Sequence, residues 1–273
     1  MAIGRKFLTY GVLVLIALYV LAPFTWTALM SFKYDRDLLS IPPTLLPDPP
    51  TLSQYRVTLS GNFLSYFRNS LVVSTTSTVI ALVLGAPAAY GFARFRYRLS
   101  GVLFGVIVAT RMFPPVTLMI PYFLFMKSAN LLDTPWALII TYVSIELPLI
   151  VWILEGFFRE IPGEIVEAAE VDGLGPFAIF TRIALPISLP AVSVAASLSF
   201  ITAWNEFIFA LALTRSPEAQ TVPVGLASGI TSVGFDFGPV TAGASLYVLP
   251  VLAFTFLAQR GLKKGLAVGG STG

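Results

Sequence analysis

Residues 7–31 read FLTYGVLVLIALYVLAPFTWTALMS, a stretch without a single charged side chain. A helix needs about 20 apolar residues to cross the hydrocarbon of a bilayer, because each residue advances it by about 1.5 Å. Arg5 and Lys6 precede the stretch, as in a secretory signal peptide, but the apolar run is longer than such a peptide needs and no small-residue cleavage pattern follows it. The sequence therefore predicts an uncleaved membrane span here.

The whole chain has the composition of a membrane protein. Of its 273 residues, 56% are hydrophobic and only 11% are charged, whereas a soluble domain carries about 25% charged residues. Five further stretches are long and apolar enough to be spans, at about 71–93, 101–125, 136–158, 187–213 and 241–258. We therefore expect an all-α, polytopic membrane protein whose six transmembrane helices form a single transmembrane domain over residues 1–273.

The composition also excludes several kinds of chemistry. The chain contains no His and no Cys, so it lacks the usual general base near neutral pH, thiolate nucleophiles and the commonest metal ligands. It has no G-x-x-x-x-G-K-[ST] run to hold nucleotide phosphates. A net charge of +3 is too small to indicate nucleic-acid binding. We expect no catalytic residue, no metal site and no cofactor bound by this chain.

The distribution of Lys and Arg indicates the orientation of the spans. Ten of these residues lie on the side that holds both termini and six lie on the opposite side. Arg94, Arg96 and Arg98, in one short connection, contribute most to this difference. Because cytoplasmic loops are enriched in Lys and Arg, we expect both termini in the cytoplasm. The long Pro-rich loop over residues 32–69 then lies outside, either as a contact for a partner or as a simple tether.

The inner connection over residues 159–186 is unusually acidic. It holds five of the 14 acidic residues, which are Glu160, Glu164, Glu167, Glu170 and Asp172. Pro162 and Gly173 have the positions of helix start and stop signals, and a second short helix is expected from Pro176 until Pro186 closes it. An acidic helix with small residues can enter a groove of another protein, where its glutamates pair with Arg or Lys. The alternative is an amphipathic loop that packs on its own bundle.

A spaced motif lies within this connection. Glu167-Ala168-Ala169 is followed by three residues, Gly173, nine residues and Ile183-Ala184-Leu185-Pro186. This spacing resembles the EAA signature of ABC importer permeases. The flanking stretches 158–162 and 203–207 are similar to the maltose-type, carbohydrate branch of that family, and within the branch the chain most resembles the second, G-type permease subunit. The resemblance covers most of the chain.

The resemblance implies a role in transport. The chain would form half of the translocation path for a sugar or related solute and would catalyse no reaction itself. Its partners would be a second permease subunit, an ATP-binding cassette ATPase dimer that carries ATP and Mg²⁺, and an extracytoplasmic solute-binding protein, in the plasma (inner) membrane of a bacterium or archaeon. The ATPase would dock at Glu164, Glu167, Ala168, Ala169, Asp172 and Gly173, supported by Ile183, Leu185 and Pro186. The family's tail can reach the ATPase interface, but residues 268–273 depart from its usual small-residue ending.

Five residues inside the predicted spans are candidates for the translocation path or its gate. They are Arg111, Glu146, Trp204, Asn205 and Glu206. A charge at the bilayer centre costs at least about 2.5 kcal/mol, and Arg111 and Glu146, each roughly 15 Å deep, could neutralise each other as a structural ion pair. Trp204, Asn205 and Glu206 either contact a sugar, through ring stacking and hydrogen bonds, or form a gate or a helix-packing contact.

Two other classes of function remain open from the sequence. A self-contained secondary transporter or channel would explain the intramembrane charges but would leave the acidic connection without a role. A membrane enzyme would have only carboxylates or serines for its chemistry, and no pair of them is visibly positioned. Pro114-Pro115 and Pro121, which interrupt the third span, fit a transport path and a purely structural kink equally well.

Overall fold

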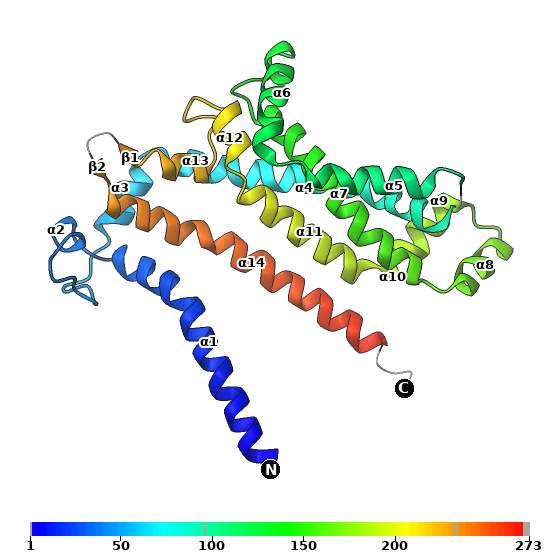
Figure 1. The fold of residues 1–273 in the computed structure, drawn as a ribbon, viewed down its shortest axis with the longest axis horizontal. Coiled ribbons are helices and arrows are strands. Elements are labelled where there is room, and N and C mark those ends of the chain that lie inside the picture. Colours follow the sequence, from blue (N-terminus) through cyan, green and yellow to red (C-terminus); the bar gives the residue numbers. More distant parts are fainter. Residues whose placement is uncertain (1, 96, 232–233, 270–273) are drawn as a thin grey trace. The chain divides into compact units, whose positions relative to one another are not determined.

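The computed structural model describes residues 2–95, 97–231 and 234–269 (Figure 1). Between its turns and loops the described chain is helical, with one short antiparallel pair of strands in which Ile230 is opposite Phe235. In chain order the elements are α1 (Ala2–Met30), α2 (Asp35–Leu38), α3 (Ser53–Ser60), α4 (Phe63–Arg94), α5 (Ser100–Ala109), η1 (Thr110–Met112), α6 (Pro115–Ser128), α7 (Pro135–Glu160), α8 (Gly163–Val171), α9 (Pro176–Ile179), η2 (Phe180–Ala184), α10 (Leu185–Ile187), α11 (Leu189–Trp204), α12 (Ile208–Leu213), α13 (Val222–Ala227), β1 (Ile230–Thr231), β2 (Gly234–Phe235) and α14 (Phe237–Gly269).

Four of these helices are long and apolar enough to cross a membrane. They lie at Thr9–Met30, Phe63–Arg94, Pro135–Glu160 and Phe237–Phe256. Two bent pairs, Ser100–Met112 with Pro115–Ser128 and Pro176–Ile187 with Leu189–Trp204, raise the number to six if each pair is one span. These helices confirm the prediction of an all-α, polytopic membrane protein. Helices suit hydrocarbon because their backbone groups form hydrogen bonds with one another.

The third predicted span is broken rather than continuous. Helices α5–η1 and α6 meet at an angle of 99°. Phe113, the residue before Pro114, is extended with φ −73° and ψ 127°, because the ring of a following proline disfavours the helical conformation. Pro115 then occupies the first turn of α6, where its missing N–H has no helical partner to lose.

Residues 1–64 and 225–249 form one compact part of the chain. The Pro-rich segment after α1 is not simply extended there, since it contains α2 and α3. The Gln54 side chain is buried and donates to the Lys33 carbonyl at 3.1 Å and to Asp35 Oδ1 at 2.7 Å. The Thr58 hydroxyl donates to the carbonyl of Pro239, at the start of α14, at 3.1 Å. The predicted outer loop is therefore folded.

Residues 65–224 and 250–273 form the second compact part. One hydrophobic cluster joins α4, α7, α8, α9, η2 and α11, and a second joins α4, α6, α7, α11, α12 and α13. The rings of Tyr90, Phe158 and Phe180 lie 5.3–6.1 Å apart between centroids in the first cluster. These rings connect α4 and α7 to the segment that follows α8.

Candidate functional site

Helix α8 carries the acidic motif on an exposed face. Glu164, Glu167, Ala168 and Val171 are exposed, with Val171 reaching 87%. Their spacing of three, one and three residues places them on one side of a helix. On the other side Ala169 is buried in the first hydrophobic cluster and Val166 packs against it. The helix is thus anchored by two small apolar side chains while its acidic side is available to a partner.

Gly173 ends α8 as the sequence predicts. Its φ is +83°, a left-handed conformation that costs little only for glycine. The Leu174 amide donates to the Ala169 carbonyl and the Gly173 amide donates to the Glu170 carbonyl, both at 3.0 Å. These two bonds form a Schellman motif, which satisfies the last carbonyls of the helix. Asp172, the C-cap residue, is exposed beside the same stripe.

The supporting residues lie in the helical segment after α9. Ile183 and Leu185 are half-buried against the first cluster, whereas Pro186 is exposed. The expectation that Pro186 closes the second helix is wrong, because the helix runs on to Ile187. Pro186 has no N–H for the Arg182 carbonyl, and the preceding turn widens into a π-helix in which the Leu185 amide donates to the Phe180 carbonyl. The chain bends by 79° only after Ile187.

A pocket of about 330 Å³ lies beside α8, and Tyr90, Arg94, Glu167 and Pro176 are among its lining residues. Arg94, in the last turn of α4, donates from Nη2 to the Ile161 carbonyl at 2.6 Å. Ile161 is the residue between α7 and α8, so Arg94 connects α4 to the start of the acidic segment. From the sequence, Arg94 served only as an indicator of orientation. The residues around it give no sign of a hydrogen bond to a carbonyl 67 residues away.

Arg111 and Glu146 do not form the predicted ion pair. The Arg111 Nη1 donates to the Ile145 carbonyl at 3.1 Å and the side chain is exposed. Glu146 is 0% exposed and its Oε1 accepts from the Ser77 hydroxyl at 3.0 Å. Arg111, on η1, thus bonds a backbone carbonyl of α7, whereas Glu146, on α7, bonds Ser77 of α4. Depth along the spans does not reveal these partners. Glu155, near the end of α7, does pair with Arg159, which donates from Nε to Oε1 at 2.9 Å.

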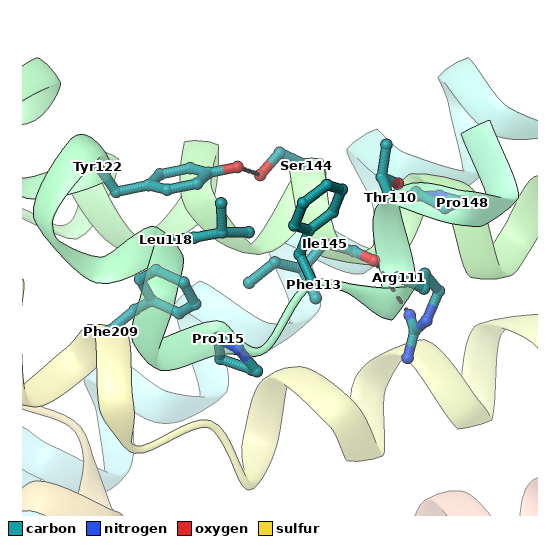
Figure 2. Close-up of a pocket in the computed structure, with 10 residues that line it drawn as sticks. All are labelled: Thr110, Arg111, Phe113, Pro115, Leu118, Tyr122, Ser144, Ile145, Pro148 and Phe209. Atoms are coloured by element: carbon teal, nitrogen blue, oxygen red, sulfur yellow. Dashed lines mark hydrogen bonds between the residues drawn. The ribbon is translucent and has the colours of Figure 1, made fainter. Parts of the chain in front are cut away.

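Arg111 belongs to a small pocket at the break between η1 and α6 (Figure 2). The pocket has a volume of about 150 Å³ and also contains Phe113, Tyr122, Ser144 and Phe209. The hydroxyls of Tyr122 and Ser144 lie 2.6 Å apart and share a hydrogen bond. Helix η1 before the break, α6 after it, α7 and α12 thus supply a mixed aromatic and polar surface.

The Trp204-Asn205-Glu206 group has a mainly structural geometry. Trp204 is 1% exposed and packs between Phe67 and Phe200, with ring centroids at 5.6 Å and 5.5 Å. Such burial leaves no open ring face for a sugar in this conformation and favours the helix-packing alternative. Asn205 is exposed and donates from Nδ2 to the Ile201 carbonyl at 2.8 Å.

Glu206 acts as a cap for the next helix. Its Oε1 accepts from the Phe209 amide at 2.9 Å, and its Oε2 accepts from the Ala210 amide at 3.0 Å and from the Tyr142 hydroxyl at 2.9 Å. The first amides of a helix have no partner within it, so a carboxylate placed there stabilises the helix and its dipole. Glu206 therefore fixes the start of α12 to α7.

Fold and site together define an integral membrane protein of the transport class: long apolar helices, a broken span with a polar pocket, and an acidic helix outside the spans. The model of the family "Binding-protein-dependent transport system inner membrane component" matches residues 60–267. The chain belongs to this family, and it is an ABC importer permease rather than an enzyme. The resemblance inferred from the EAA spacing is confirmed.

Relatives of assigned function match almost end to end. The chain is 35% identical to the trehalose transport system permease protein SugB of Mycobacterium tuberculosis, over 99% of this chain and 100% of that one. It is 33% identical to the trehalose/maltose transport system permease protein MalG of Thermococcus litoralis, over 95% and 94%. A chain of a solved bacterial ABC transporter that imports the acidic polysaccharide alginate shares the fold, with a TM-score of 0.79, 23% identity and coverage of 94% and 95%.

Proposed function

We propose that this permease imports a carbohydrate and couples to a separate ATPase through α8. The carbohydrate class is supported by the trehalose and maltose systems to which the two relatives belong. The coupling is supported by one observation above all: the exposed stripe of Glu164, Glu167 and Ala168 on a helix that is anchored by its opposite side. An exposed carboxylate stripe suits a groove that carries Arg or Lys.

Movement of α8 has a physical route to the spans. Ala169 fixes the helix to the cluster that holds the Tyr90, Phe158 and Phe180 rings, and packed interiors move as units. Arg94 adds a hydrogen bond from the end of α4 to the residue before α8. A displacement of α8 by a closing ATPase dimer would therefore shift α4 and α7 together. ATP and Mg²⁺ would remain on the ATPase, and this chain would bind no cofactor.

The remaining parts of the proposal concern the assembly. The whole chain would act as one transmembrane domain, pair with a second permease subunit to enclose the path, and receive solute from an extracytoplasmic binding protein. Both termini and α8 would be cytoplasmic, as the distribution of Lys and Arg indicates. The C-terminal tail would extend toward the ATPase dimer, although its last residues, 270–273, lie outside the described residues.

Site-directed cross-linking tests the docking of α8. The chain has no Cys, so Ala168→Cys introduces a single thiol, and a reagent that joins a thiol to a lysine amine should link it to the ATPase subunit in the assembled complex. Ser128→Cys, an exposed position at the end of α6, is the matched control and should give no such product. Glu167→Arg should reduce both ATPase association and ATP-dependent import. The proposal is overturned if import by the wild-type complex continues after ATP depletion and the Glu167→Arg variant remains fully active.

A further inference from the structure

The pocket at the η1–α6 break cannot face lipid. Arg111, Thr110 and Ser144 are exposed on this surface of the chain, and Arg111 lies about 16 Å along the helical path from Ser100. An arginine exposed to hydrocarbon at that depth costs at least about 2.5 kcal/mol. The surface must therefore face either water in the translocation path or another protein subunit.

The groups in the pocket match a hydroxylated ring. Within the described part of the chain, the one hydrogen bond of the Arg111 side chain is from Nη1 to the Ile145 carbonyl, so its other N–H groups remain as donors. Tyr122 and Ser144 add hydroxyls that can each donate or accept. Phe113, 58% exposed, offers a ring face, whereas the Tyr122 ring packs against Phe209 at 5.2 Å between centroids. Figure 2 shows Arg111 and Tyr122 at opposite ends of this group.

The size of the pocket limits what it holds. Its volume is about 150 Å³, whereas drug-sized ligands occupy pockets of roughly 300–1,000 Å³. The pocket can therefore hold only a small part of a larger solute. The break in the backbone helps to form it, because Pro114 and Pro115 end one helix and begin another at 99°. Broken helices often line the binding positions of transporters near the middle of the membrane.

We propose that this pocket contacts one pyranose ring of the carbohydrate during its passage, with Arg111 and the Tyr122–Ser144 pair bonding ring hydroxyls and Phe113 covering the apolar face. This proposal rests on the carbohydrate class inferred above. It assigns solute contact to Arg111 and excludes Trp204, whose ring is covered by Phe67 and Phe200.

Transport by the complete complex in proteoliposomes tests the pocket. The solute is whichever sugar of a panel that includes trehalose and maltose the wild-type complex imports best. Arg111→Met and Phe113→Leu should each raise the KM for that sugar about tenfold, which is the effect of losing a charged hydrogen bond or a ring contact, with little change in the maximal rate. Arg111→Lys should restore part of the affinity. Phe125→Leu, at a ring that is 59% exposed further along α6, and Arg68→Met, at an exposed arginine of α4, are the controls and should leave KM unchanged.

The outcomes separate the two proposals. If the wild-type complex imports no sugar of the panel, the carbohydrate assignment is wrong. If it imports one and the Arg111 and Phe113 variants keep the wild-type KM, the pocket is not a solute contact. If the variants instead fail to assemble with the second permease, measured by co-purification, the pocket is a subunit interface and the inference is likewise overturned. Ser144→Ala, a small change on α7, is the second variant: it should also raise KM, and an unchanged KM would contradict solute contact at this pocket.

Discussion

The hydroxyl of Ser77 on α4 donates to Oε1 of Glu146 on α7 at 3.0 Å, in a place from which solvent is fully excluded. Glu146 Oε2 and the Thr78 hydroxyl are also buried; Thr78 lies close enough to act on the carboxylate, but among the described residues neither atom makes a hydrogen bond of normal geometry. No Lys or Arg of the described chain forms an ion pair with Glu146. A bare carboxylate would be costly here, whereas a protonated carboxyl has an O–H to donate.

We therefore expect Glu146→Gln to be tolerated and Glu146→Ala to be harmful. The glutamine amide keeps both an acceptor for Ser77 and a donor. Alanine removes this bond, leaves Ser77 only the Ser74 carbonyl at 3.2 Å and opens a cavity between α4 and α7, at a cost of about 1–3 kcal/mol. Thermal unfolding of the solubilised complex and import in proteoliposomes measure both effects. A glutamine variant as unstable as the alanine variant would show that the negative charge is needed.

The same two helices make a close contact at Gly85. A Cβ atom built there would lie 2.7 Å from Cγ2 of Ile150, a buried and β-branched side chain. Such chains have little freedom to move aside, and membrane helices use small residues where they approach closely. Gly85→Ala should destabilise the bundle by about 1–3 kcal/mol. Gly91→Ala, on the same helix but with nothing within 4 Å, should not, and equal melting temperatures for the two variants would contradict the packing described.

The long helices were predictable because the bilayer leaves an apolar segment few other structures. Apolar runs of sufficient length marked α1, α4, α7 and α14, and the double proline marked an interruption of the third span. The size of the bend was not predictable. Pro87 and Pro148 lie inside continuous helices, whereas Pro114 separates two helices. What differs is whether surrounding side chains and backbone satisfy the freed carbonyls, which the local sequence does not specify.

The candidate site shows the same division. The stop at Gly173 depends on residues within one turn of helix, so the sequence contained enough information to predict it. The roles of Trp204 and Glu206 depend on Phe67 and Tyr142, which lie more than 60 residues away in the chain. Similarly, equal depth suggested that Arg111 and Glu146 pair, but the rotation of each helix decides which partner a side chain meets. Arg111 meets the Ile145 carbonyl and Glu146 meets Ser77.

The left-handed Gly173 gives a direct test of the end of α8. Gly173→Ala adds no steric contact, since nothing lies within 4 Å of a Cβ there, but its φ of +83° is unfavourable for alanine by about 1–2 kcal/mol. We expect the variant to shift or fray the helix end and to lower the coupling between ATP hydrolysis and import. Gly175→Ala is the matched control, because its φ is −74° and its surroundings are equally open. Equal coupling ratios in the two variants would remove the conformational argument for Gly173.

Asp133 fastens the connection between α6 and α7 to the segment after α12. Its Oδ1 accepts from the Arg215 amide at 2.7 Å and from the Ser216 amide at 2.9 Å. Partial burial opposes ionisation, but these bonds, a further one from the Ser216 side chain and the Arg215 charge outweigh it and hold the pKa of Asp133 below its ordinary value of 3.8. Hydrogen bonds to the charged form stabilise that form in the folded protein.

The sign of the resulting pH dependence follows from this lowered pKa. The stabilisation is fully present above about pH 4, where the unfolded carboxyl is also ionised, and it is lost as the pH falls toward the folded pKa, because the unfolded state then takes up the proton first.

Asp133→Asn should lower stability at pH 7 by about 1 kcal/mol, allowing for solvent screening, and should flatten the loss of stability below pH 4. Asparagine accepts the positive φ of 61° at this position, so backbone strain does not contribute. Melting temperatures from pH 3 to pH 7 measure the effect, and Asp48→Asn, at an exposed carboxylate, is the control. If the melting temperatures of wild type and Asp133→Asn change with pH in parallel, the ionised Asp133 carboxylate does not stabilise the fold.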